Sequence, residues 1–155
     1  MFKTRCLTPV AMLALALAIS LAGVESIPAA EAAPAHELTE SDLLWLARII
    51  SSEARGESFE GQVAVGAVVL NRVGSPDYPS TVRGVIFQPG QFQPVANGRI
   101  YLPPAASAER AAVAAASGWD PSGGALFFFN PQKSRHPFMV RRPVATVIGS
   151  HWFTF

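Results

Sequence analysis

The chain has 155 residues, of which 50% are hydrophobic and 15% are charged, so it holds enough apolar material for the core of one domain. Lys and Arg together number 12, Asp and Glu 11, and the formal net charge at pH 7 is +1. Neither a basic patch for nucleic acid nor a polybasic run for a membrane surface stands out, and we expect no nucleic-acid partner.

The first residues have the pattern of a secretory signal peptide. Lys3 and Arg5 make a positively charged start, the apolar run "LTPVAMLALALAISLA" follows, and small residues around Ala22 offer a cleavage site. The run is short for a membrane span and contains polar residues, so a cleaved signal is favoured over a retained anchor. We therefore expect an exported protein that meets a membrane only through this segment.

Composition divides the chain into three parts. Residues 1–30 are expected to form the signal peptide with a small-residue leader, residues 31–38 a flexible leader, and residues 39–155 the folded domain. The single cysteine, Cys6, falls in the first part, so the folded domain enters an oxidising compartment with neither a thiol nor a disulfide.

A first helix is predicted over "SDLLWLARIISSEAR", residues 41–55. Thr39 or Ser41 can cap its N-terminus. One apolar face is made by residues at helical spacing, namely Leu43, Leu46, Ala47, Ile50 and Ala54. Glu53 lies at the border of that face, because it follows Ile49 by four residues and Ile50 by three.

A second helix is predicted after a break at Gly56, which ends or bends the first helix. Ser58 can cap the new segment "FEGQVAVGAVVLNRV", which is apolar almost all round. Its valines also suit a buried strand. We favour a helix, because the segment is long and begins at a capping residue.

The rest of the domain alternates turns with short elements. A turn-rich stretch "GSPDYPST" precedes a short element "TVRGVIF", and a long irregular loop "QPGQFQPVANGRIYLPP" leads to an alanine-rich helix that Gly118 closes. Strand composition follows in "ALFFFN" and "VATVIGSHWFTF", where Gly149 and Ser150 can turn a hairpin and Phe127 and Phe129 share one strand face. The sequence therefore predicts an α+β fold, mainly helical, with a minor β-hairpin part.

The stretch "SSEARGESFEGQ" holds three carboxylates within eight residues, Glu53, Glu57 and Glu60. Burial of Glu53 against the apolar face would raise its pKa toward the range of a general acid at neutral pH. Glu57 would act in the same direction if the helix continued to it, because like charges at i and i+4 repel. The alternative is a helix-end glutamate that only caps the helix or pairs with Arg55.

One reaction that uses such a general acid is the cleavage of a glycosidic bond, in which a carboxylic acid protonates the leaving oxygen. The ordinary retaining and inverting forms of this reaction also need a second carboxylate. Glu57 is the strongest candidate, although a purely structural role is open to it as well. The other acidic residues of the domain that we considered lie in turns, on a surface helix or at a helix start: Asp77, Asp120, Glu109 and Glu60.

Metal and serine chemistry find little support in the motifs. The histidines are His36, His136 and His151, without an HExxH or a comparable spacing, and no G-x-S-x-G occurs. We therefore predict no metal site and no cofactor.

Aromatic side chains crowd the second half of the domain and could supply flat apolar faces for a sugar. Most of them must belong to the core, and one or two would suffice to line a sugar-binding surface. Three amide side chains lie close to them in sequence, Gln91, Asn97 and Asn130.

Four runs follow one another along the chain: "SSEARGESFEGQVAVGAVVLNRV", "GVIFQPGQFQPVANG", "GWDPSGGALFFFNP" and "RRPVATVIGSHWF". Together they resemble the catalytic domain of the cell wall hydrolase family that includes the spore cortex-lytic enzymes. The likeness spans about Leu43 to Phe153. It implies a small lysozyme-like fold and makes residues 39–155 a cell wall hydrolase catalytic domain.

The resemblance implies cleavage of peptidoglycan glycan strands between N-acetylmuramic acid and N-acetylglucosamine. The family's catalytic glutamate is the first Glu of its E-A-R-G-E motif, which is Glu53 here. By likeness to lytic transglycosylases, this residue protonates the bond and then serves as base while the muramyl 6-hydroxyl closes a 1,6-anhydro ring, so no second carboxylate is needed. The expected substrate-binding residues are Glu57, the pair Gln91 and Phe92, and the pair Phe129 and Asn130.

The chain departs from the family pattern in two places. Tyrosines are usual where it has "FFF" at residues 127–129, and "PQKSRHPFMVRRP" replaces a Trp-containing segment, so sugar contacts from these positions would differ. Two alternative functions are a zinc amidase that cuts the muramyl-peptide link through His136 and His151, and a non-catalytic peptidoglycan-binding module. We expect a monomer whose partner is the peptidoglycan glycan strand.

Overall fold

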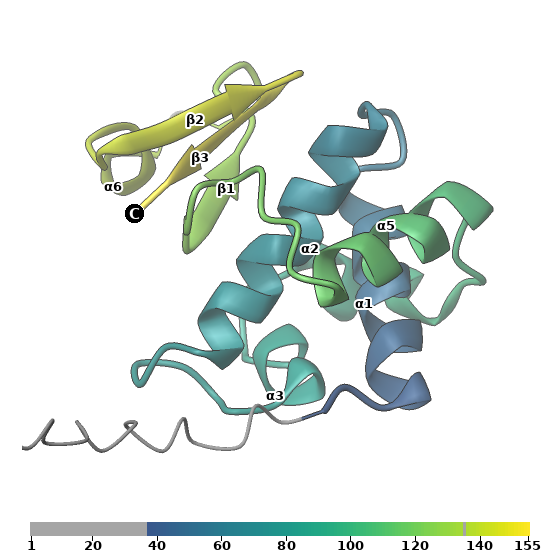
Figure 1. Cartoon of the computed structure of the whole chain (residues 1–155). Coiled ribbons are helices and arrows are strands. Elements are labelled where there is room, and N and C mark those ends of the chain that lie inside the picture. The colour runs from purple at the N-terminus through teal and green to yellow at the C-terminus, as the bar shows by residue number, and fades with distance from the viewer. Residues whose placement is uncertain (1–36, 135) are drawn as a thin grey trace, which may run out of the picture. The chain divides into compact units, whose positions relative to one another are not determined.

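The structure of the protein, a computed structural model, describes residues 37–134 and 136–155 (Figure 1). Its helices are α1 (Glu40–Glu53), α2 (Phe59–Val73), α3 (Val82–Ile86), α4 (Gln93–Ala96), the 3₁₀ helix η1 (Arg99–Tyr101), α5 (Ala106–Ala116) and α6 (Pro137–Val140). Its strands are β1 (Phe127–Phe129), β2 (Val144–Ile148) and β3 (His151–Thr154). The predicted α+β, mainly helical class is confirmed, whereas the predicted signal peptide lies outside the described residues. Within those residues, no helix has the length and apolar character that crossing a membrane requires.

α1 begins with a capping box. The Thr39 hydroxyl accepts a hydrogen bond from the Asp42 backbone N–H at 3.2 Å, and the Asp42 carboxylate accepts one from the Thr39 N–H at 3.0 Å. These two bonds satisfy backbone donors that a helix N-terminus otherwise leaves free. Thr39, not Ser41, is therefore the residue that starts the helix.

The C-terminus of α1 falls at Glu53, earlier than the predicted end at Arg55. Ala54 has left the helical region, with φ −125° and ψ 20°, and its carbonyl accepts a hydrogen bond from the Glu57 N–H at 3.0 Å. The chain turns at once because this bond closes a tight turn. Glu57 is consequently not on the helix, and the expected i,i+4 repulsion with Glu53 does not arise from helical geometry.

α2 is a helix, as predicted, and Ser58 caps it by accepting from the Gly61 N–H at 3.2 Å. It is buried on nearly all sides because it packs against α1, α3, α5 and β1. A Cβ atom at Gly66 would lie 2.8 Å from Ile50 Cδ1 and 3.3 Å from Ala115 Cβ. The glycine therefore lets α1 and α5 approach α2 closely, which explains why this helix carries small residues among its valines.

The hydrophobic core joins the three long helices to the sheet. Its largest fully buried side chains are Leu46, Ile49, Ile50, Val63, Val65, Val68, Val69, Val82, Val85, Ile86, Ile100 and Phe153. Full burial of a side chain of this size stabilises the fold by about 1.5–3 kcal/mol relative to exposure. Phe153 comes from β3, so the sheet is packed onto the helical core through its central strand.

The sheet has three antiparallel strands in the order β1-β3-β2 and lies beside α2, with α5 on the other side of that helix (Figure 1). Phe128 pairs with Phe153 and Phe129 with Trp152. β2 and β3 form the predicted hairpin, turned at Gly149 and Ser150, where Gly149 has φ +57°. β1 falls within the predicted strand segment "ALFFFN" and pairs with β3 as the third strand of the sheet.

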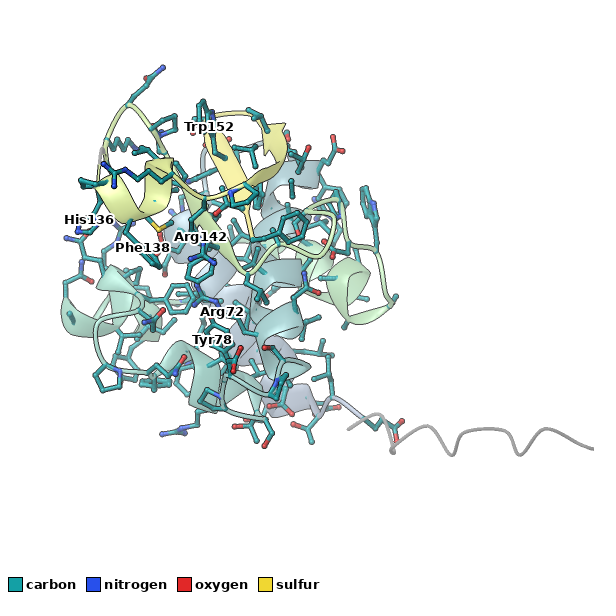
Figure 2. The ribbon with its side chains drawn as sticks, turned by 90° about the vertical axis from the view of Figure 1, so that its left-hand side faces the viewer. Arg72, Tyr78, His136, Phe138, Arg142 and Trp152 are labelled. Atoms are coloured by element: carbon teal, nitrogen blue, oxygen red, sulfur yellow. The ribbon has the colours of Figure 1, made fainter. Side chains whose placement is uncertain are left out.

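Arg72 ties the sheet to α2. This arginine is only 5% exposed, and its Nε–H donates to the Leu126 carbonyl, one residue before β1, at 2.7 Å. Figure 2 shows Arg142, Arg72 and Tyr78 in one column, and the rings of Phe127 and Tyr78 lie 5.4 and 5.2 Å from the Arg72 guanidinium carbon. Cation–π contacts of this kind compensate part of the cost of burying a charge.

Short helices occur in two segments for which no helix was predicted. The long loop of residues 88–104 contains α4 and η1, and the segment of residues 131–143 contains α6. Helices of three or four residues are too short to show periodicity in a sequence. The first loop is fastened to the end of α1, because Ser52 Oγ donates to the Arg99 carbonyl at 3.4 Å and the Ala105 N–H donates to Ser51 Oγ at 3.0 Å. This fastening brings the loop beside Glu53.

Candidate active site

A cavity of about 540 Å³ opens where the end of α1 meets α4, η1, the end of β1 and the start of β3. Its walls come from four separate parts of the chain. They are lined by Ser52, Glu53, Gly56 and Glu57; by Gln93, Pro94, Asn97 and Arg99; by Phe128, Phe129, Asn130, Lys133 and Ser134; and by His151.

Glu53 reaches the cavity from the last turn of α1 and is half-buried. Burial raises the pKa of this carboxyl, and the positive charge of Arg99 offsets part of the increase. Within residues 37–134 and 136–155, no ion pair joins Glu53 to Arg55, which was the structural alternative for this residue. A carboxyl with a raised pKa is suited to donate a proton near neutral pH.

Arg99 is placed beside Glu53 by the chain around it. Its carbonyl accepts from the hydroxyl of Ser52, which precedes Glu53, and its N–H donates to Asn97 Oδ1 at 3.1 Å. Gly98, between them, has φ +77°. This bent backbone presents Asn97 and Arg99 together on one wall of the cavity.

The environment of Glu57 lowers its pKa, whereas that of Glu53 raises it. Its Oε2 accepts from the Ser150 N–H at 3.1 Å, its Oε1 accepts from the Ser150 hydroxyl, and His151 Nδ1 lies 3.5 Å from Oε1. Desolvation alone would raise the pKa of Glu57, but the Ser150 hydrogen bonds and the charges of His151 and Lys133 outweigh it, so this pKa is lowered. Both carboxylate oxygens are thus engaged, and the group is ionised at neutral pH.

The wall formed by β1 combines aromatic and amide side chains. Phe129 is 7% exposed and packs edge-on to Trp152, with 5.9 Å between ring centroids, whereas Phe128 is half-buried against His151. Asn130 Oδ1 accepts from the Gln132 N–H at 2.9 Å and so shapes the turn that carries Lys133. Phe129 and Asn130, expected along the glycan, therefore both line the cavity.

Gln91 and Phe92, also expected along the glycan, do not line the cavity. Phe92 is 5% exposed, with its ring 6.4 Å from that of Phe128, and Gln91 Oε1 accepts from Arg72 Nη1 at 3.3 Å. The chain enters α4 immediately after Phe92, and this turn presents Gln93 and Asn97 to the cavity instead. The loop expected to meet the glycan does border the cavity, through Gln93 and Asn97 and not through Gln91 and Phe92.

Several residues of the cavity were not assigned to a site from the sequence. Arg99 and Gln93 carried no signal beyond their place in a long polar loop, and Lys133 lies in the segment that departs from the family pattern. His151 was considered only as a zinc ligand. Desolvation lowers the pKa of His151, partly offset by the charge of Glu57, so this imidazole is neutral at pH 7.

Metal ligands are not gathered at this cavity. In the part of the chain that the structure describes, no three His, Cys, Asp or Glu residues lie close enough together to hold a metal ion. His136 is exposed just before α6 and does not line the cavity, whereas His151 does. The two histidines of the zinc alternative are therefore not brought together in it.

The fold and the site define a small, mainly helical domain with a carboxyl of raised pKa, Glu53, in a cavity. The sequence profile of the Cell Wall Hydrolase family matches residues 56–154, about two thirds of the chain, and the chain belongs to this family. The matched span contains Glu57 and the whole β part and begins just after Glu53. The family resemblance seen in the sequence is thereby confirmed.

Relatives of known identity agree with this assignment. The chain is 47% identical over 115 residues to the spore cortex-lytic enzyme of Bacillus subtilis. The aligned region covers 74% of this chain and 38% of that protein. It is 30% identical over 122 residues to the cell wall hydrolase CwlJ of the same organism, covering 74% of this chain and 85% of that protein. The chain thus spans about four tenths of the length of the spore cortex-lytic enzymes it matches.

Solved structures share the fold. The catalytic domain of the Bacillus cereus SleB protein superposes with a TM-score of 0.74 at 44% identity, covering 77% of this chain and 94% of that domain. The catalytic domain of SleB from Bacillus anthracis, described as a germination-specific lytic transglycosylase, gives the same TM-score and identity and is covered to 98%. The mainly helical fold with its small sheet is therefore that of a known catalytic domain.

Proposed function

We propose that this chain cleaves peptidoglycan glycan strands between N-acetylmuramic acid and N-acetylglucosamine, as a lytic transglycosylase with Glu53 as the general acid and base. The protonated carboxyl of Glu53 gives its proton to the glycosidic oxygen while the bond from that oxygen to muramyl C1 breaks. The resulting carboxylate accepts the proton of the muramyl 6-hydroxyl as O6 bonds to C1. The products are a 1,6-anhydromuramic end and a new N-acetylglucosamine end, and Glu53 recovers its proton.

The observation that carries this proposal is the contrast between the two carboxylates of the cavity. Glu53 is half-buried with a raised pKa, so it can hold a proton, while both oxygens of Glu57 are engaged by the β2–β3 turn. A retaining or inverting hydrolase needs a second carboxylate free to attack or to activate water. A transglycosylase needs only one, because the substrate supplies the nucleophile.

The names of the relatives support the same reaction. The B. anthracis domain is described as a lytic transglycosylase and the B. subtilis relative as a cortex-lytic enzyme, and this chain covers nearly the whole of the former. Transfer of the reaction to this chain is our inference from 44% identity in the shared catalytic domain.

The glycan contacts that we propose follow the walls of the cavity. Phe129 and Asn130 line the cavity at the end of β1, and Gln93 and Asn97 line it at α4. Amide side chains can bond sugar hydroxyl and acetamido groups, and an aromatic face can pack on a pyranose ring. These contacts do not include Gln91 and Phe92, because Phe92 is buried and neither residue lines the cavity.

The setting of the reaction follows from the N-terminal sequence. We propose that residues 1–30 direct export, that residues 31–38 connect to a catalytic domain over residues 39–155, and that a monomer works in the periplasm or cell wall. Peptidoglycan lies in that compartment, which agrees with the family assignment.

Digestion of purified sacculi, followed by mass spectrometry of the released fragments, tests the reaction. Anhydromuramic ends that vanish in Glu53→Gln and persist in Glu60→Gln are the expected result, since Glu60 is an exposed glutamate that does not line the cavity. Ordinary reducing muramic ends would identify a hydrolase instead. Free peptides released in an EDTA-sensitive way would identify the zinc amidase, and sacculus binding without products a binding module.

A further inference from the structure

We propose that Glu57 is a positioning residue, which holds the β2–β3 turn and His151 against the turn that follows Glu53 and so sets the width of the cavity. We call Glu57, Gly149, Ser150 and His151 the clasp. The inference rests on the proposed function, because it concerns the geometry around the acid. It gives Glu57 a different role from the substrate contact expected from the family resemblance.

The backbone of Glu57 is fixed on the helical side. Its N–H donates to the Ala54 carbonyl at 3.0 Å, in the turn directly after Glu53, and its carbonyl accepts from Gln62 Nε2 at 3.1 Å. Gln62 is only 5% exposed, so this donor is itself immobilised in the core. The direction of the Glu57 side chain is therefore set by groups that belong to α1 and α2.

The side chain of Glu57 then crosses to a turn 93 residues further along the chain. Ser150 offers it two donors, the backbone N–H and the hydroxyl. Hydrogen bonds to an ionised acceptor are roughly twice as strong as neutral ones. One carboxylate thus joins the helical side of the cavity to the sheet.

Gly149 is shaped to receive this carboxylate. A Cβ atom at Gly149 would overlap Glu57 Oε2, and the residue has φ +57°, which side chains other than glycine rarely adopt. The turn therefore leaves open the space that the carboxylate fills.

His151 carries the effect of the clasp into the cavity wall. It is 9% exposed, its Nδ1 lies 3.5 Å from Glu57 Oε1, and among the described residues this nitrogen has no hydrogen-bond partner. Its ring packs edge-on to Phe128 at 5.5 Å, and Phe128 lines the cavity. A shift of the turn would therefore move both side chains relative to Glu53.

The charges around Glu57 determine when the clasp is closed. His151 faces it from β3, Lys133 from the turn after β1, and Glu53 lines the same cavity from α1. The pKa of Glu57 is lowered, so the ionised clasp is complete at neutral pH and is lost as the pH falls through that lowered value. Acid conditions should therefore reduce wild-type activity toward that of a clasp-deficient variant.

Kinetics of purified full-length variants on soluble peptidoglycan fragments test the proposal. Displacement of catalytic groups by about 1 Å can cost on the order of 10²-fold in rate, so we expect Glu57→Ala to lower kcat by about that factor with little change in KM. Glu57→Gln keeps the shape and one acceptor and should recover part of the loss, and Ser150→Ala should lose less than Glu57→Ala. Glu60→Gln, a matched change outside the cavity, should keep the wild-type kcat.

Two measurements on the protein alone separate this proposal from the proposed function. The charge of Glu57 raises the pKa of His151, so NMR titration of the imidazole should give a lower pKa in Glu57→Gln. The Ser150 amide should exchange with solvent faster in Glu57→Ala. If the wild type releases no glycan product, the proposed function fails while these readouts still show whether the clasp exists.

Two results would overturn the positioning role. One is Glu57→Ala with the wild-type kcat and pH profile. The other is a raised KM with unchanged kcat, which is the signature of a direct substrate contact. If Glu57→Ala does not fold, Ser150→Ala and Glu57→Gln decide between the same outcomes.

Discussion

The helical core and the walls of the cavity are held together by different interactions. α1, α2 and α5 are held by apolar burial, with side chains such as Leu46 and Val65 fully inaccessible. The cavity is bounded by α4, η1 and the two turns beside the sheet, where a few polar contacts between distant parts of the chain add to buried side chains such as Ile100. We therefore expect core substitutions to change the free energy of unfolding and wall substitutions to change catalysis.

Glu53→Gln should give the largest effect, a loss of catalysis without a loss of stability. Loss of a general acid lowers kcat by about 10²–10⁴-fold. The free energy of unfolding should not fall at pH 7, because a carboxyl with a raised pKa adds stability only at low pH and loses it as the pH rises through that value. Urea unfolding and product release measured on one preparation check both statements. A strongly destabilised Glu53→Gln would place Glu53 with the core.

Leu46→Ala should have the reverse effect, a loss of stability with little change in catalysis. Leu46 is fully buried on α1, two turns before Glu53, and its truncation should lower the free energy of unfolding by about 2–5 kcal/mol. Leu44→Ala, on the same helix but at a side chain 42% exposed, should change it by less than about 0.5 kcal/mol. Under conditions where Leu46→Ala remains folded, kcat should stay close to wild type. An equal loss in both variants would contradict the burial argument.

Arg99→Ala should shift the pH dependence of catalysis without removing it. The charge of Arg99 lowers the pKa of Glu53, so its removal should move the alkaline limb of the kcat/KM profile to higher pH. Arg110→Ala, an exposed arginine on α5 that does not line the cavity, serves as the control. An unmoved limb in Arg99→Ala, or a limb that moves equally in both variants, would show that Arg99 does not act on Glu53.

Thr39→Ala should give the smallest effect. It removes the capping box of α1 and should lower the free energy of unfolding by about 1 kcal/mol. Ser41→Ala tests the alternative cap and should change stability little. Thermal unfolding distinguishes the two, and kcat should be the same in both. A larger loss in Ser41→Ala would mean that the helix starts differently.

The long elements could be predicted because each carries its own signal. α1 and α2 show capping residues and apolar patterns long enough to recognise, and the β2–β3 hairpin is marked by Gly149 and Ser150. The end of α1 was placed too late because a single turn bond, from the Glu57 N–H to the Ala54 carbonyl, outweighs helix propensity there. Family resemblance added Glu53, Phe129 and Asn130, which all line the cavity.

The choice between Gln91 and Gln93 could not be made from the sequence. Both lie in one polar loop, and only the docking of that loop on Ser51 and Ser52 decides which amide faces the cavity. Arg99, in the same loop, was missed as a cavity residue for the same reason. An element of three or four residues is too short for its sequence pattern to show which way each side chain faces.

The sequence by itself determined the class of fold, the three long helices, the hairpin and the glutamate that borders the buried face of α1, because these depend on local pattern and short-range capping. The tertiary structure alone decided how the three nearby carboxylates differ. Glu53 is desolvated and can hold a proton, Glu57 is ionised by donors 93 residues away, and Glu60 stays exposed. The physical reason is that a pKa depends on burial and on charged or donating neighbours, which folding brings together from distant parts of the chain.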